Sequence, residues 1–128
     1  MLLVAAVAAL AAPAADKVIT LPGFNLTALP FDAYSGYLHV PGPFELNEYS
    51  YLEIHYQFHT SQRDPQNDPL VTWHQGGPGA SSVNLGLYTE MGYFNTDDKG
   101  THVNPKAWNK VANMCVTRPL LHPQHFCK

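Results

Sequence analysis

The chain has 128 residues, of which 45% are hydrophobic and 13% are charged. This length is enough for one domain or for a piece of one. The formal net charge is −3 at pH 7, and the few lysines and arginines are scattered singly. A basic stripe for nucleic acid is therefore excluded, and no nucleic-acid partner is expected.

Residues 1–15 consist almost wholly of Leu, Val and Ala, with Pro13 near their end. This run is shorter than the roughly twenty apolar residues that span a bilayer. Small residues at 12–15 are typical of a signal-peptidase site, so we expect a signal peptide over 1–15 and a mature chain that starts at Asp16. No other segment is apolar enough to cross a membrane, and no membrane contact is expected after cleavage. The triplet Asn25-Leu26-Thr27 is an acceptor for N-glycosylation, in keeping with the secretory route.

Residues 16–34 contain two prolines and a glycine and predict an extended, irregular arm. Two strands are expected next, over residues 35–40 and 51–60, and they are expected to pair as an antiparallel hairpin with a long connection. The second strand alternates, with Leu52, Ile54, Tyr56 and Phe58 on one face and Glu53, His55, Gln57 and His59 on the other. Two imidazoles four residues apart on a strand are too distant to chelate one ion well, so His55 and His59 are expected to be solvated.

A short buried strand is predicted over residues 70–74, and it leads into Gly76-Gly77-Pro78-Gly79. Ser81 or Ser82 can cap the helix that follows. The helix carries a stripe of apolar residues at helical spacing that predicts a core contact, namely Val83, Leu87 and Met91. A turn over 95–100 and an approach to a further strand over 107–114 complete the pattern. This order of elements agrees with the opening of an α/β sheet.

The glycine-rich run carries the chemistry of the chain. Glycines at the end of a strand let the backbone approach a ligand closely, because no Cβ stands in the way. Backbone amides left free there can donate to an oxygen that carries negative charge. A plain surface turn is the alternative for these four residues. A phosphate-binding loop would need a lysine directly after the glycines, and none follows Gly79 before Lys99.

The flanking residues resemble the serine carboxypeptidases, whose run Trp-x-Asn-Gly-Gly-Pro-Gly-Cys-Ser-Ser is followed by an apolar helix and Glu-x-Gly. The matching residues here are Trp73, Gln75, Gly76, Gly77, Pro78, Gly79, Ser81, Ser82, Glu90 and Gly92. Further motifs occur in the family's order at 16–23, 34–38, 56–58, 67–69 and 104–114, so the resemblance covers nearly all of residues 16–114. It implies the N-terminal fragment of an α/β-hydrolase fold, with an antiparallel hairpin, a third strand, a glycine oxyanion loop and a first helix.

The resemblance also implies roles for four residues. The amide of Gly77 is expected to help hold the oxyanion that forms when a serine attacks the peptide carbonyl. Gln75, Gly76 and Glu90 correspond to positions that recognise the free carboxylate of the substrate. Gln75 replaces the family's Asn and adds one methylene, and the helix carries one extra residue, among 83–86, ahead of Glu90. An ordinary solvated residue is the alternative for Glu90.

The nucleophile of the family lies in a Gly-x-Ser-x-Gly elbow, followed by Asp and His. No such elbow occurs in this sequence, so no catalytic residue is assigned and all three would lie downstream. Residues 115–128 diverge from the family, as a frameshift or splicing artefact would produce. Their possible metal ligands, Cys115, His122, His125 and Cys127, lack the paired spacing of zinc sites, and two prolines interrupt the backbone; neither metal nor another cofactor is expected. The two cysteines could instead form a disulfide in an oxidising compartment.

We therefore expect the N-terminal part of a serine-type carboxypeptidase, a hydrolase that releases C-terminal amino acids from peptides and proteins. The enzyme would be secreted or delivered to the lysosome or vacuole. The 128-residue chain alone is expected to be inactive. A non-catalytic secreted interaction module, derived from the same N-terminal part, is the alternative function.

Overall fold

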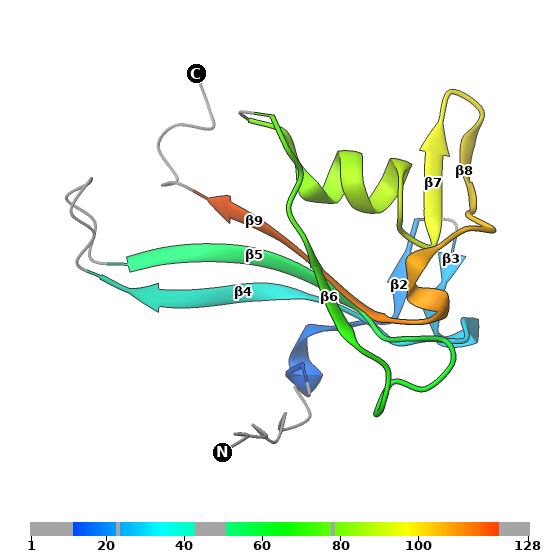
Figure 1. Cartoon of the computed structure of the whole chain (residues 1–128), viewed down its shortest axis with the longest axis horizontal. Coiled ribbons are helices and arrows are strands. Elements are labelled where there is room, and N and C mark those ends of the chain that lie inside the picture. Colours follow the sequence, from blue (N-terminus) through cyan, green and yellow to red (C-terminus); the bar gives the residue numbers. More distant parts are fainter. Residues whose placement is uncertain (1–11, 23, 43–50, 78, 121–128) are drawn as a thin grey trace, which may run out of the picture.

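We analysed a computed structural model of the chain, and the structure describes residues 12–22, 24–42, 51–77 and 79–120 (Figure 1). Most of the predicted signal peptide lies outside these residues, and so do His122, His125 and Cys127. Within the described ranges, no helix is both long and apolar enough to span a membrane.

The centre of the molecule is a five-stranded sheet in the order β1-β4-β5-β9-β6. Its strands are β1 (Lys17–Val18), β4 (Ala33–Pro41), β5 (Tyr51–His59), β6 (Leu70–Trp73) and β9 (Asn113–Leu120). All neighbours are antiparallel except β6 and β9, which run parallel. The predicted hairpin is confirmed as β4 and β5, which pair from Ala33 opposite His59 to Pro41 opposite Tyr51. The sheet and its few helices also confirm the predicted N-terminal portion of an α/β-hydrolase fold.

Smaller elements surround this sheet. Two short hairpins are formed by β2 (Thr20–Leu21) with β3 (Phe24–Asn25) and by β7 (Phe94–Asp97) with β8 (Gly100–Val103). The predicted turn at 95–100 is therefore too long, because most of its residues pair in β7 and β8. The helical segments are η1 (Ala14–Asp16), η2 (Leu26–Ala28), η3 (Ser82–Leu87) and η4 (Trp108–Lys110).

The helix η3 lies above one face of the sheet, and the N-terminal η1 lies below the other (Figure 1). The predicted apolar stripe on η3 is confirmed, because it packs on β9 in the first core, which comprises Val83, Leu87, Met91, Ala112, Met114 and Val116. A second core lies where the N-terminal arm folds over the same face, and it comprises Leu26, Phe31, Ala33 and Phe94. Both cores therefore lie on the η3 side of the sheet.

Two predictions about burial are wrong. His59 was expected in solvent, but it is only 5% exposed, because it pairs with Met114 on the core face and stacks near Phe31. The strand predicted over 70–74 ends at Trp73 and is not buried, since β6 is an edge strand and Leu70 is 46% exposed. Pro119 does not interrupt the backbone either, because β9 runs through it opposite Ile54.

The loop of residues 61–69 fixes where β6 begins. Ser61 donates its backbone amide to Asn113 Oδ1 over 2.9 Å and its hydroxyl to Asp68 Oδ2 over 2.5 Å. Hydrogen bonds from Arg63 and Ser61 hold the pKa of Asp68 at about 2, so the carboxylate is ionised at neutral pH. Asn113 also donates to the carbonyl oxygens of Pro65 and Asp68, each over 3.0 Å. Since Asn113 is the first residue of β9, these bonds tie the loop to the centre of the sheet.

Candidate active-site loop

The glycine loop follows β6 at the edge of the sheet and is exposed. Gly77 and Gly79 have φ values of 92° and 80°, a region that side chains disfavour. The amide of Ala80 donates to the Gly77 carbonyl over 3.0 Å and closes a turn. The amide of Gly77 itself makes no hydrogen bond to any part of the chain that the structure describes, so it is free to donate to a ligand.

Two serines join this loop to η3. Ser81 caps the helix, because its Oγ accepts from the amide of Asn84 over 3.2 Å. Ser82 is 6% exposed, and its Oγ accepts from the amide of Gln75 over 3.0 Å. The strand end before the glycines is thus held by the first turn of the helix after them, which fixes the path of the loop.

The side chains of Trp73, Gln75 and Glu90 form a chain of hydrogen bonds beside the loop. The indole Nε1 of Trp73 donates to Gln75 Oε1 over 2.9 Å, and Gln75 Nε2 lies 3.5 Å from Glu90 Oε1. Because the oxygen of the Gln75 amide group accepts from the Trp73 indole, its nitrogen points toward Glu90. The structure therefore brings together two of the residues that were expected to recognise a carboxylate.

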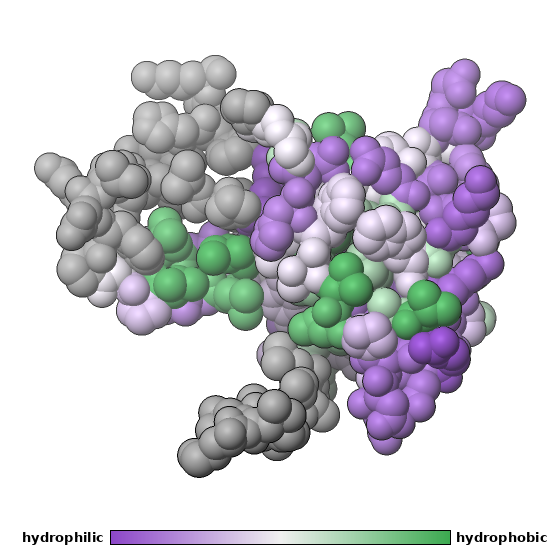
Figure 2. Space-filling model, in the orientation of Figure 1, coloured by the Kyte–Doolittle hydropathy of each residue, from purple (hydrophilic) through white to green (hydrophobic). Residues whose placement is uncertain are grey.

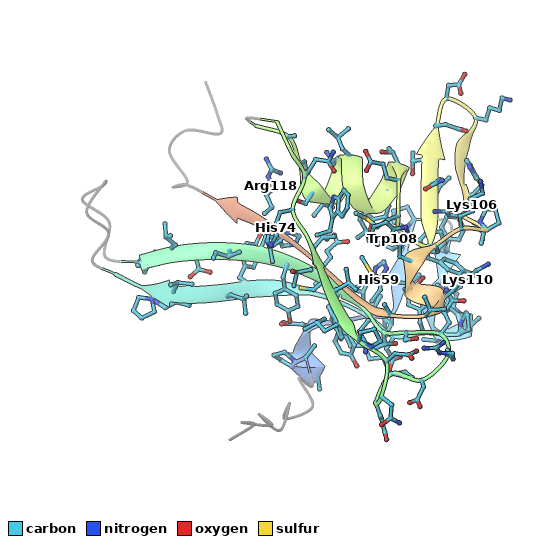
Figure 3. The ribbon with its side chains drawn as sticks, in the orientation of Figure 1. His59, His74, Lys106, Trp108, Lys110 and Arg118 are labelled. Carbon is cyan, nitrogen blue, oxygen red and sulfur yellow. The ribbon has the colours of Figure 1, made fainter. Side chains whose placement is uncertain are left out.

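The indole of Trp73 is itself held by packing. It meets Trp108, which is labelled in Figure 3, edge-on with the ring centroids 5.4 Å apart. A Cβ on Gly86 would lie only 2.8 Å from Trp73 Cδ1 and Nε1. Gly86 is thus needed for the indole to lie against the helix. No role was assigned to Trp73 or Gly86 from the sequence, and Ser82 was given only a possible role as a helix cap.

The helix η3 departs from the α-helical hydrogen-bond pattern. Its residues make a π-helix, and the amide of Met91 reaches back five residues to the carbonyl of Gly86 over 3.0 Å. A π-turn contains about one residue more than an α-turn, so it absorbs an insertion without turning the rest of the helix away. Glu90 lies near Gln75, and its side chain is exposed.

The other predicted site residues lie apart from this group. Asn25 is exposed at the start of η2, where its Oδ1 accepts from the amide and the hydroxyl of Thr27 over 3.1 and 2.7 Å. Cys115 has no disulfide partner among the residues described, and Cys127 lies outside them. In the same part of the chain, no group of three or more histidine, cysteine or acidic side chains could hold a metal ion.

An antiparallel hairpin beside a parallel pair of strands, with a glycine loop that leads from the third strand into a helix, defines the opening of an α/β-hydrolase sheet. The family model for serine carboxypeptidase matches residues 22–117. The chain therefore belongs to the serine carboxypeptidase family, as its motifs predicted. The match includes Cys115, Val116 and Thr117, which begin the segment that was expected to diverge.

Curated relatives agree with this assignment. The chain is 45% identical over 107 residues to serine carboxypeptidase ctsa-4.1 of Caenorhabditis elegans, which covers 82% of this chain and 21% of the relative. It is 43% identical to the lysosomal protective protein of Mus musculus, over 81% of this chain and 20% of that protein. Serine carboxypeptidase 1 of Hordeum vulgare is 40% identical, with coverages of 81% and 21%. The chain thus spans about a fifth of the length of these relatives.

The fold of this chain is also similar to part of a solved carboxypeptidase structure. The crystal structure of a prohormone-processing carboxypeptidase from Saccharomyces cerevisiae matches with a TM-score of 0.50 and 26% sequence identity. The match covers 67% of this chain and 18% of that enzyme. The fold described above is accordingly the fold of one part of a serine carboxypeptidase.

Proposed function

We propose that this chain supplies the oxyanion-binding and carboxylate-binding part of a serine-type carboxypeptidase, which releases C-terminal amino acids from peptides and proteins. The observation that carries the proposal is the contact of Gln75 with both Trp73 and Glu90 beside an exposed glycine pair. A recognition site for a free carboxylate needs oriented donors, and the indole orients the Gln75 amide group. No cofactor enters the proposal.

The carboxylate of Glu90 would repel the carboxylate of a substrate unless a proton or a donor lies between them. The amide nitrogen of Gln75 carries two hydrogens, so one can point to Glu90 and the other to the substrate. Gly76 and Gly77 follow Gln75 directly in the sequence, and within the described residues their backbone amides make no hydrogen bond. In this arrangement Gly76 adds a donor to the carboxylate, while Gly77 donates to the oxyanion of the tetrahedral intermediate.

The nucleophilic serine and its Asp and His partners belong, in this proposal, to a part of the enzyme outside these 128 residues. The sequence has no Gly-x-Ser-x-Gly elbow, so the isolated chain would bind without hydrolysing. The proposal further includes a secretory route, with cleavage of a signal peptide over 1–15 and a glycan on the exposed Asn25. The name of the mouse relative, a lysosomal protective protein, supports a lysosomal destination. Secretion or delivery to a vacuole, with no membrane contact after cleavage, also belongs to this proposal.

The proposal can be tested by placing residues 22–117 of this chain in serine carboxypeptidase 1 of Hordeum vulgare, in place of the matching segment. The chimera should hydrolyse a peptide acid faster than the same peptide amide. Gln75→Leu should reduce that preference about tenfold or more, which is the loss expected from one hydrogen bond to a charged group. Gln66→Leu, the same change in the exposed turn of the 61–69 loop, is the matched control and should leave the preference unchanged.

Suppose that the folded chimera hydrolyses both peptides but Gln75→Leu leaves the ratio of the two hydrolysis rates unchanged. Gln75 then does not bind the substrate carboxylate. If the folded chimera is inactive on both, the carboxypeptidase proposal fails. The non-catalytic interaction module would then be the better account of the chain.

A further inference from the structure

The second core of the molecule is hollow. A cavity of about 200 Å³ lies between the sheet and the N-terminal arm, and its apolar walls include Leu21, Leu26, Phe31 and Phe94. An apolar cavity of about 150 Å³ is large enough to hold benzene. The space in this core is thus sufficient for a single aromatic ring with one substituent.

One polar side chain in the wall is left without a partner. His59 lines the cavity and is 5% exposed, and its Nδ1 makes no hydrogen bond within the described residues. Figure 3 shows His59 near the centre of the molecule, between the sheet and the smaller elements on the right. Burial lowers the pKa of His59 to about 4, so the imidazole is neutral at physiological pH and can accept a hydrogen bond. A buried acceptor without a donor costs free energy, which a ligand with a hydroxyl group would recover.

Two other polar side chains of the wall, Ser35 and Tyr88, have partners. Ser35 Oγ lies 3.0 Å from His55 Nε2, and the Tyr88 hydroxyl donates to Gln57 Oε1 over 3.2 Å. The side chains that line the cavity include no Asp, Glu, Lys or Arg. A charged ligand would therefore lose its hydration without gaining a counter-charge, which favours a neutral ligand.

The cavity has a route of entry. A second, more open depression of about 230 Å³ shares Leu21, Tyr88 and Phe94 with it. These three side chains form the wall between the two spaces, and Tyr88 is only half-buried. Rotation of such side chains would admit a small ring without any change in the backbone.

We propose that this cavity is a binding site for a small neutral aromatic ligand with one hydroxyl group, of the size of phenol. The ring packs between Phe31 and Phe94, and the hydroxyl donates to His59 Nδ1. None of Gln75, Gly77 and Glu90 lines this cavity, so the site is separate from the loop of the proposed carboxypeptidase and does not depend on that function.

The test is an NMR titration of the full chain with phenol and with toluene, which have similar shapes and differ in the hydroxyl group. Phenol should bind at least about tenfold more tightly than toluene, as expected for one buried hydrogen bond. His59→Leu should remove that preference, and Ala33→Leu should abolish binding of both ligands by filling the space. Ala28→Leu, the same change on an exposed residue, is the control and should bind like the wild type.

Equal affinity for phenol and toluene in the wild type would overturn the role of His59, and so would an unchanged preference in His59→Leu. A lack of nuclear Overhauser contacts between bound phenol and the rings of Phe31 and Phe94 would overturn the location. That last measurement uses the wild-type chain alone, so it decides the question even if a variant fails to fold.

Discussion

The two cores on the η3 side of the sheet differ in how completely they are filled. In the first core, Leu87, Met91, Met114 and Val116 are each at most 2% exposed and pack against the indole of Trp73. The side chains of the second core are also buried, but this core borders a cavity, and among the described residues His59 Nδ1 in its wall has no hydrogen-bond partner. The filled core is the one that carries the glycine loop.

This difference indicates which part of the molecule needs a fixed geometry. Side chains that bind a substrate must be held by packed neighbours, because small displacements weaken their hydrogen bonds. Trp73 is held by Gly86 and Trp108, and it orients Gln75 in turn. The N-terminal arm packs over the second core and leaves space there.

The surface shows the same division. Figure 2 shows apolar residues gathered over the β4–β5 end of the sheet and again near the lower centre, while hydrophilic residues cover most of the side of β7 and β8. Leu38 and Leu70, both nearly half exposed, lie on the sheet face opposite η3 and line an apolar groove with Phe58. Within the described residues, the face of the two cores is therefore better covered than the face that carries Leu38 and Leu70.

The largest expected effect is on the filled core. Leu87→Ala should lower the free energy of unfolding by about 3–5 kcal/mol, because Leu87 is 2% exposed and its truncation would leave a cavity among the packed neighbours of the first core. Chemical denaturation of the purified chain measures this change. Leu85→Ala on the same helix is the control, and it should cost less than about 1 kcal/mol because Leu85 is 46% exposed. Similar losses for both variants would show that η3 does not pack as described.

The next expected effect is a dependence of stability on pH, which arises from His59 in the second core. Burial lowers the pKa of His59 from 6.5 to about 4, and no charged group contributes to this shift. The unfolded chain therefore binds a proton at a higher pH than the folded chain, so stability should fall as the pH decreases from 6.5 toward 4. The maximum loss is roughly 3 kcal/mol, from about 1.4 kcal/mol per pKa unit.

Denaturation of the wild type and of His59→Gln at several pH values measures this effect. The variant should lose most of the slope between pH 6.5 and 4, whereas His102→Gln, a change at an exposed histidine, should retain it. An identical slope in the wild type and His59→Gln would mean that His59 is not buried in the neutral form.

The smallest expected change in stability comes from adding the same methyl groups to each of the two cores. Ala33 borders the cavity and Ala112 lies in the filled core, and both are almost fully buried. Ala33→Val should change stability by less than about 0.5 kcal/mol or increase it, while Ala112→Val should cost about 1–3 kcal/mol because the added methyl groups have no space. Thermal unfolding of the pair measures the difference, and the reverse order would contradict the distinction between the cores.

Local patterns predicted much of this structure. The alternation of residues 51–60 was sufficient for the second strand of the hairpin, and the spacing of Val83, Leu87 and Met91 was sufficient for the apolar stripe that packs in the first core. Both features depend on residues that are near one another in the chain. The resemblance of the glycine run correctly implied the family.

The burial of His59 could not be predicted in this way. The apolar residues of β5 indicated that its other face was solvated, but the arm of residues 16–34 folds over that face and covers His59. The edge position of β6 likewise depends on its pairing with β9, more than forty residues away in sequence. The contact between Gln75 and Glu90 depends on the π-helix, whose form no periodicity in the sequence indicated.

The most direct test of the active-site loop compares two glycines in the carboxypeptidase chimera. Gly77 and Gly100 are both exposed and have φ values of 92° and 114°, so replacement by alanine strains both backbones alike. If the amide of Gly77 holds the oxyanion, Gly77→Ala should displace it and lower kcat about a hundredfold, while Gly100→Ala should leave kcat within about twofold of the parent chimera. Equal kcat values for the two variants would contradict the assignment of the glycine loop.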